Sequence, residues 1–323
     1  MSDWKLQTPV AFLIFNRPET TERVFAEIAR AKPPKFLVVA DGPRPDRPEE
    51  VEKCGATRAI IERVDWDCEI LTNYSDVNLG CKRRISSGLD WVFDTVEEAI
   101  ILEDDCLPHP TFFRFCAELL EKYRLDHRIM HIAGCNLTHS KPASGDSYFF
   151  SKYGGIWGWA TWKRAWSLYD VGMQTWPLLR DTGLIENMLQ KPEQIKYWKT
   201  IFQKTYQGEI DTWDFQWILS CWLQSALAII PSSNLIENIG FGSEATHTTG
   251  TGRCEDMTTM AMRFPMVHPT YMFPNYSADL CIGKTYFSYK IISRIKSKIK
   301  KMIELKFLKN LLSIIISIII APH

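Results

Sequence analysis

Three acidic residues, Glu103, Asp104 and Asp105, follow directly after the apolar run 99–102. Four apolar residues bounded by charge predict a buried strand, and in α/β proteins ligands bind outside the carboxyl ends of the strands. Carboxylates gathered at one strand end repel one another unless a cation lies between them, and their hard oxygens suit Mg²⁺ or Mn²⁺. The triplet therefore predicts a divalent-metal site for a phosphorylated ligand, although an acidic, solvated turn has the same composition.

Two earlier strand ends also carry polar side chains. The apolar run 10–15 is followed by Asn16 and Arg17, and the run 36–40 is followed by Asp41. Because the carboxyl ends of parallel strands lie along one edge of a sheet, we expect these residues to converge on the acidic triplet. Arg17 could contact a phosphate or a base carbonyl, and Asp41 could accept hydrogen bonds from a base or a ribose. The alternatives are a surface position at a helix start for Arg17 and a turn-forming role for Asp41.

A run of cations, Lys82, Arg83 and Arg84, follows Gly80 at a predicted helix start. Backbone N–H groups at such a start favour anions, so Lys82 and Arg83 are candidates for contact with a diphosphate, and a solvated helix face is the other interpretation. The chain contains no Gly-x-Gly-x-x-Gly or Walker sequence. That absence argues against a dinucleotide oxidoreductase or a P-loop enzyme.

Glycines and tryptophans are combined in residues 154–162, which include Trp157 and Trp159. Flat rings with a polar edge stack well on sugars, and glycines allow a close backbone approach. Trp157 and Trp159 are therefore candidates for contact with a sugar acceptor, and packing of a small second lobe is the competing interpretation.

Two further titratable side chains could take part in the chemistry. A helix predicted over 211–227 carries Asp214 near its start, beside two tryptophans. A partly desolvated carboxylate there would make a usable general base, whereas simple stabilisation by the helix dipole is the structural alternative. His247 lies in the glycine-rich stretch 240–252. It could complete a metal site, or the stretch could close over a ligand.

Buried strands alternate with helices in the first part of the chain. Continuous apolar strands joined by helices predict an α/β fold with a mostly parallel sheet covered on both faces. The predicted strands are 10–15, 36–40, 69–72, 99–102 and 129–133, and the predicted helices are 18–31, 47–63, 85–93 and 110–123.

The C-terminal segment 284–323 differs sharply from the rest of the chain. The 323 residues carry 38 basic and 38 acidic side chains, yet nine cations and a single acid fall between Lys284 and Lys309. Apolar residues at helical spacing between these cations predict an amphipathic helix on an anionic membrane surface, and the apolar run 311–320 is too short to cross a bilayer. A partner-binding helix and a poorly folded terminus are the alternatives. With nine scattered cysteines and no recognisable secretory signal, we expect a cytoplasmic protein, peripheral on the inner face of the cell membrane.

From about Pro9 to Gly250 the chain resembles the GT-A glycosyltransferases, in particular the N-acetylglucosaminyltransferases that build N-glycans and their bacterial relatives. The matching features are Phe15-Asn16-Arg17, Asp41 after the second strand, Glu103-Asp104-Asp105 followed by Pro110-Thr-Phe-Phe113, Trp157-Gly158-Trp159, and Asp214 before a Gly-Phe-Gly stretch.

The resemblance implies a role for each of these residues. A nucleotide would bind to Asn16, Arg17 and Asp41, with Asp41 on a uracil. Ribose and diphosphate would contact Glu103 and Asp104, and Asp105 would ligate Mn²⁺ or Mg²⁺. By the same resemblance Asp214 would be the base, and His247 would contact the metal or the diphosphate. The eukaryotic members carry an N-terminal membrane anchor, whereas the predicted membrane-binding segment of this chain is C-terminal. By analogy with the bacterial relatives, the acceptor would therefore be a lipid-linked or surface glycan.

We therefore predict a GT-A domain over 1–283, with a nucleotide-binding part at about 9–135 and an aromatic-rich acceptor part at about 136–250, followed by the tail 284–323. The predicted activity is metal-dependent, inverting transfer of a sugar from a nucleotide-diphosphate donor, a UDP-sugar, to a glycan or lipid-linked hydroxyl in surface polysaccharide synthesis. No nucleic-acid partner is expected. Two alternatives stay open: a sugar-1-phosphate nucleotidyltransferase, and a non-catalytic protein that binds glycans or membranes.

Overall fold

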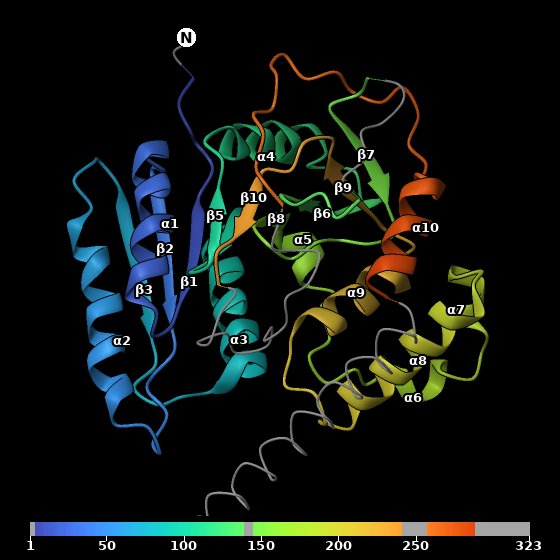
Figure 1. The fold of residues 1–323 in the computed structure, drawn as a ribbon, viewed down its shortest axis with the longest axis horizontal. Coiled ribbons are helices and arrows are strands. Elements are labelled where there is room, and N and C mark those ends of the chain that lie inside the picture. Colours follow the sequence, from blue (N-terminus) through green and yellow to red (C-terminus); the bar gives the residue numbers. More distant parts are fainter. Residues whose placement is uncertain (1–3, 139–144, 241–256, 288–323) are drawn as a thin grey trace, which may run out of the picture.

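The computed structural model describes residues 4–138, 145–240 and 257–287. Its centre is an eight-stranded mixed sheet with the strand order β3-β2-β1-β4-β8-β6-β9-β7 (Figure 1). In chain order these strands are β1 (Val10–Ile14), β2 (Lys35–Ala40), β3 (Glu69–Tyr74), β4 (Glu98–Glu103), β6 (Ile129–Ala133), β7 (Tyr148–Ser151), β8 (Trp159–Trp162) and β9 (Leu227–Pro231). Two short strands, β5 (Cys106–Pro108) and β10 (Ile236–Asn238), form a separate antiparallel pair.

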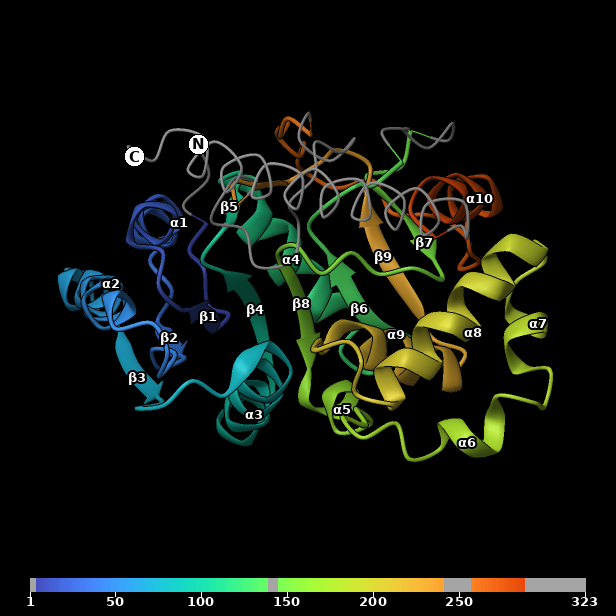
Figure 2. The ribbon, with the colours of Figure 1, turned by 60° about the horizontal axis from the view of Figure 1, so that its bottom comes forward.

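Helices cover both faces of the sheet (Figure 2). Alternate residues of a strand point to opposite faces. In β1, Val10, Phe12 and Ile14 belong to the same buried cluster as residues of α1 and α4, whereas Ala11 and Leu13 belong to a cluster with residues of α3 and α9. The α-helices are α1 (Pro18–Ala31), α2 (Glu49–Ala59), α3 (Gly80–Thr95), α4 (Thr111–Lys122), α5 (Lys163–Trp166), α6 (Trp176–Leu179), α7 (Leu184–Met188), α8 (Pro192–Tyr206), α9 (Asp214–Leu223) and α10 (Tyr276–Thr285). The predicted α/β fold with helices on both faces of the sheet is therefore confirmed.

Two strands of the sheet run against their neighbours: β8, in the interior, and the edge strand β7, which pairs antiparallel with β9. Strands β3, β2, β1 and β4 are mutually parallel, whereas β8 pairs antiparallel with both β4 and β6. Ile101, near the carboxyl end of β4, pairs with Trp159, the first residue of β8. The residues that precede β8 therefore reach the same edge of the sheet as the residues that follow β1, β2 and β4.

A cluster of aromatic side chains holds together the helices beyond β8. Trp176, Trp198, Phe202 and Trp222 are buried there with Tyr153. The rings of Trp198 and Trp222 lie 4.9 Å apart at 62°. This packed cluster confirms the aromatic-rich part of the predicted fold, while the proposed division near residue 135 stays a prediction.

The long helix predicted over 211–227 is shorter than expected at both ends. The helix α9 begins at Asp214 and ends at Leu223, and Leu227 already belongs to β9. An apolar run cannot by itself separate a buried helix from a buried strand. The change of structure occurs at Ser225, whose φ of 52° takes the chain out of the helix. The prediction for 47–63 was closer, since α2 there continues into the 3₁₀ turn Ile60–Arg63.

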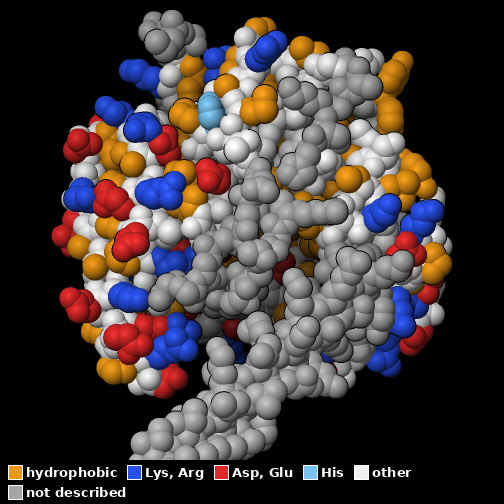
Figure 3. Space-filling view, in the orientation of Figure 1, with side chains coloured by type: hydrophobic (Ala, Val, Ile, Leu, Met, Phe, Trp, Pro, Cys, Tyr) orange, Lys and Arg blue, Asp and Glu red, His pale blue; other side chains and the backbone are white. Residues whose placement is uncertain are grey.

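No helix in residues 4–138, 145–240 and 257–287 is long and apolar enough to cross a membrane. Of the basic tail, residues 288–323 lie outside the described part of the chain. The surface over α1 and α2 carries basic and acidic side chains side by side (Figure 3). Ion pairs such as Arg63 with Glu22 link some of them.

Candidate functional site

Two cavities adjoin at the carboxyl edge of the sheet. The β1–β2 cavity, of about 300 Å³, is bordered by the ends of these two strands and by the start of α3. The β6–α9 cavity, of about 340 Å³, lies between the residues that follow β6, the residues that precede β8, and the start of α9. Arg17, Cys81 and Glu103 line both cavities, so a ligand that extends past these side chains would occupy the two together.

The predicted acidic cluster lies at the junction of the two cavities. Arg17 Nη1 donates to Asp105 Oδ2 at 2.7 Å and lies 3.6 Å from Asp104 Oδ1. Asp104 is buried, and its Oδ2 accepts the backbone N–H of Phe15 at 3.1 Å. The carboxylate of Glu103 accepts no hydrogen bond from any side chain or backbone group in the described part of the chain. The convergence of Arg17 with the triplet, predicted from the strand ends, is therefore present.

Within the described part of the chain, the positive charge of Arg17 does not balance the negative charge of this cluster. Burial raises the pKa of Glu103 well above its usual range, and the charges of Asp105 and Asp104 raise it further. Burial also raises the pKa of Asp104, while the Arg17 guanidinium opposes that rise. Since three acids face one guanidinium, the fully ionised cluster would be stabilised by a further cation.

A metal ion fits this cluster only in part. Within the described residues, no group of three or more His, Cys, Asp or Glu side chains is arranged to hold a metal ion. Glu103 and Asp105 nevertheless both line the β6–α9 cavity. Mg²⁺ is commonly held by one or two carboxylates together with substrate phosphates. The pair therefore fits a divalent cation whose remaining ligands come from a phosphorylated substrate. His247, the other predicted metal ligand, lies outside the described residues.

Asp41 lies under the turn that leads into α3. Its Oδ1 accepts the backbone N–H groups of Gly42 and Leu79, both at 2.9 Å. Its Oδ2 accepts the backbone N–H of Gly80 and the side-chain amide of Asn78, both at 3.1 Å. Burial raises the pKa of this carboxyl group, and the backbone hydrogen bonds oppose the rise. Asp41 thus fixes the wall of the β1–β2 cavity, and its contact with a base stays a prediction.

Replacing Asp41 by asparagine is expected to lower the free energy of unfolding by about 2 kcal/mol, because the amide leaves buried N–H donors unpaired. Urea unfolding followed by circular dichroism measures this change. Asp46→Asn is the matched control, since Asp46 is an exposed acid five residues away. Equal stability of the Asp41 variant and the control would show that the four hydrogen bonds do not hold the turn.

The backbone N–H groups at the start of α3 donate to two carboxylates of the protein. Besides Asp41, the carboxylate of Asp211 accepts the backbone N–H of Lys82 at 3.3 Å. Neither Lys82 nor Arg83 is among the described residues that line the two cavities, and Arg83 is exposed. The structure therefore does not bring these two predicted cations to the site.

Of the three cations 82–84, it is Arg84 that lines the β1–β2 cavity, together with Arg17 and Arg44. It is only 7% exposed, and its Nη2 donates to Asn73 Oδ1 at 2.8 Å. From the sequence, Lys82 and Arg83 were preferred within this run, although Arg84 lies one helical turn before the buried Gly88, so the 3.6-residue period could have identified it. Asn16, a predicted nucleotide ligand, is not among the described lining residues of either cavity.

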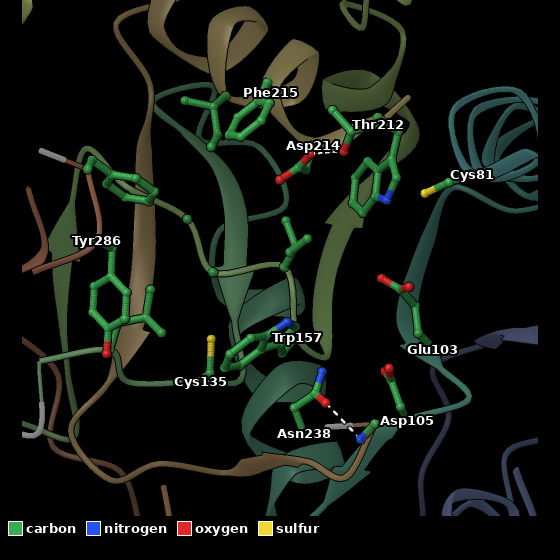
Figure 4. Close-up of a pocket in the computed structure, with 18 of the residues that line it drawn as sticks. Cys81, Glu103, Asp105, Cys135, Trp157, Thr212, Asp214, Phe215, Asn238 and Tyr286 are labelled. Atoms are coloured by element: carbon green, nitrogen blue, oxygen red, sulfur yellow. Dashed lines mark hydrogen bonds between the residues drawn. The ribbon is translucent and has the colours of Figure 1, made fainter. Parts of the chain in front are cut away.

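Asp214 faces the β6–α9 cavity from the first turn of α9 (Figure 4). The hydroxyl of Thr212 donates to Asp214 Oδ1. Across the cavity lie Glu103 and Asp105, which come from the end of β4. The structure thus brings the predicted base to the same cavity as the predicted metal ligand Asp105 and as Glu103, which was predicted to contact the ribose or the diphosphate, although they are more than a hundred residues apart in the sequence.

The two predicted acceptor tryptophans have different surroundings. Trp157 lines the β6–α9 cavity. Trp159 is 1% exposed, and its ring stacks on Trp213 at 5.4 Å and on His131 at 5.0 Å. Because its faces are covered by other rings, Trp159 is a core residue, and its assignment to a sugar acceptor was wrong. Trp157 stays a candidate.

Comparison with known proteins assigns no family. No protein-family model matches the sequence, and no curated protein matches it. Among solved structures, the 4-diphosphocytidyl-2C-methyl-D-erythritol synthase of Anaerococcus prevotii DSM 20548 is similar, with a TM-score of 0.32 and 11% sequence identity over 61% of this chain and 99% of that chain. What defines the protein is therefore its own architecture: an α/β protein with two adjoining cavities at the carboxyl edge of its sheet and an acidic cluster between them.

Proposed function

We propose that this protein is a glycosyltransferase of the GT-A type. It transfers a sugar, with inversion, from a nucleotide-diphosphate donor to a hydroxyl of a glycan or a lipid-linked acceptor in surface polysaccharide synthesis. The observation that carries the proposal is the junction of the two cavities at Arg17 and Glu103, with Asp214 on the far side of the second cavity. A donor and an acceptor can then meet beside the acidic cluster.

The nucleoside of the donor is assigned to the β1–β2 cavity. An aromatic side chain, Phe15, and the guanidinium group of Arg84 line it. A flat base requires such a combination, with an apolar surface for its ring and donors for its carbonyl oxygens. Because Arg84 offers donors alone, a base with carbonyl oxygens such as uracil is favoured, which supports a UDP-sugar.

The diphosphate is assigned to the junction. Arg17 there supplies one positive charge. Glu103 and Asp105 would hold Mn²⁺ or Mg²⁺ together with phosphate oxygens, and the ion would supply positive charge that stabilises the departing diphosphate. Asp104 holds the backbone of Phe15, and thereby the strand end beside Arg17, in place.

Asp214 is assigned as the general base. Its carboxylate would accept the proton of the acceptor hydroxyl as that oxygen attacks the sugar carbon from the side opposite the diphosphate. The hydroxyl of Thr212 fixes the orientation of the carboxylate by donating to Oδ1. A proton acceptor on one side of the cavity and positive charge on the other suit a single displacement, which is the step that inverts the sugar carbon.

A thermal-shift panel of nucleotide sugars, each with and without Mn²⁺, tests the proposal. A donor at a hundred times its Kd adds about 2.7 kcal/mol to the stability of the folded state, which in a domain of this size raises Tm by about 5 °C. We expect this shift for a UDP-sugar with Mn²⁺ and a smaller one without it. No shift with any nucleotide sugar would refute the function, and pyrophosphate release from a nucleoside triphosphate would instead identify a nucleotidyltransferase.

Gly240 provides a local test of the junction. A methyl group on this residue would lie 2.3 Å from Asp105 Oδ2 and 2.8 Å from Arg17 Nη1, so both side chains would have to move. Displacement of reacting groups by about 1 Å can lower a rate by about a hundredfold. We expect Gly240→Ala to reduce kcat/KM for the donor by about that factor. Gly55→Ala is the matched control, since a methyl group there meets nothing within 4 Å, and equal losses in both variants would contradict the assignment.

A further inference from the structure

The β6–α9 cavity has two unlike sides (Figure 4). Glu103 and Asp105 lie on one side, and Phe215 and Cys135 lie on the other. Leu137, Ile218 and Phe287 also line the cavity and pack with Phe215 in one apolar cluster; together with Cys135 we call these residues the apolar wall. The described lining residues with a formal charge are Arg17, Glu103, Asp105 and Asp214, and none of them belongs to the apolar wall.

The apolar wall is held by packing behind it. The ring of Phe215 meets Trp198 edge-on at 5.9 Å, and the ring of Phe287 lies 4.8 Å from the same tryptophan. Phe287 also lies 5.2 Å from Tyr153. Because these rings belong to the buried aromatic cluster, the wall keeps its apolar surface toward the cavity instead of collapsing into it.

An unmodified sugar chain suits this wall poorly. Each hydroxyl group that loses water needs a hydrogen-bond partner, and aliphatic and aromatic carbon atoms supply none. An alkyl or isoprenoid group needs no partner and is stabilised when carbon surfaces such as Leu137, Phe215 and Ile218 remove it from water. The chemistry of the wall therefore favours an acceptor with an apolar group close to its reactive hydroxyl.

The place where the described chain ends agrees with an acceptor of this kind. The described chain ends at Phe287, in the apolar wall itself. The residues that follow it in the sequence carry the repeated lysines and the apolar run 311–320 that predict binding to an anionic membrane surface. Binding of this sequence to a membrane would hold Phe287, and with it the cavity that Phe287 lines, close to molecules anchored in that membrane.

We propose that the acceptor is a sugar attached to a lipid carrier, with the first part of the lipid lying against the apolar wall. This inference rests on the proposed glycosyltransferase function and selects between the two acceptor classes named for it. A free oligosaccharide lacks the group that the wall would contact.

A series of alkyl glycosides tests the inference on the full-length protein. Methyl, butyl and octyl glycosides of the same sugars serve as acceptors, below their aggregation concentrations, with the donor identified by the thermal-shift panel. Each buried methylene is expected to raise affinity about fourfold, so kcat/KM should rise at least about tenfold from methyl to octyl. Equal values along the series would overturn the inference while leaving the transferase function intact. No binding or turnover of any nucleotide sugar would instead refute the function itself.

Variants of the wall provide the second measurement. Phe215→Ala and Leu137→Ser should each lower the ratio of octyl to methyl kcat/KM by about threefold or more, because each removes carbon surface from the wall. Tyr271→Ser is the control, since Tyr271 is 73% exposed and lies outside the cavity. Circular dichroism checks the folding of each variant, and the ratio is unaffected by partial loss of active protein. An unchanged ratio in both folded wall variants would overturn the proposal.

Discussion

Asp214→Asn is expected to lower kcat for sugar transfer by about a thousandfold, within the range that general bases contribute. The amide nearly preserves the shape of the side chain but cannot accept the proton of the acceptor hydroxyl. Donor affinity should stay within about twofold, because the donor nucleotide is assigned to the other cavity. Transfer is measured as release of nucleoside diphosphate with saturating acceptor, and donor affinity by calorimetric titration.

The free energy of unfolding of the Asp214 variant, measured beside its rate, distinguishes a general base from a residue that only stabilises the helix. Asp214 is the first residue of α9, where a carboxylate stabilises the helix dipole by about 0.3–1 kcal/mol. A structural role alone would therefore give a small loss of stability and little loss of rate. Asp181→Asn is the control, since the side chain of Asp181 is 83% exposed. Full transfer activity in the Asp214 variant would exclude it as the base.

Glu103→Gln is expected to reduce metal-stimulated kcat/KM by at least about a hundredfold, since a cation at this position contributes several kcal/mol to the stabilisation of developing charge. In the metal-free protein the same substitution should raise Tm. The raised pKa of Glu103 means that the folded state disfavours the ionised carboxylate, so above the ordinary glutamate pKa this charge lowers stability, and glutamine removes it.

In the Glu103→Gln variant, Tm of the metal-free protein should therefore rise while the metal-stimulated kcat/KM falls. Glu97→Gln is the control, because the side chain of Glu97 is 86% exposed and lies outside both cavities. We expect it to change neither Tm nor the Mn²⁺ dependence of transfer. A fall in Tm together with full activity in the Glu103 variant would show that Glu103 is a structural residue.

The strand ends could be predicted from sequence because they depend on local pattern. The helix α1 has the bounds predicted for it, with Pro18 in the first turn and Lys32 at φ 51° after its end. The positions of Arg17 and Glu103 then follow from the rule that parallel strands end at one edge. No tertiary information was needed to expect them together.

Other parts of the site depend on contacts between distant segments. The carboxylates of Asp41 and Asp211 occupy the N–H groups at the start of α3, which the sequence alone left open to a ligand. Trp157 and Trp159 are two residues apart and of one type, yet one lines a cavity and the other is core. That difference is set by the rings packed against Trp159, which come from β6 and from the residue before α9.

The antiparallel placement of β8 has a consequence for how this protein can diversify. Most lining residues of the β1–β2 cavity come from one uninterrupted stretch, 13–104, while the apolar wall comes wholly from residues after 134. Substitutions that change the shape of one cavity thus need not alter the other. Descendants of such a chain could exchange acceptors while retaining their donor, with Arg17, Cys81 and Glu103 as the points where the two cavities constrain each other.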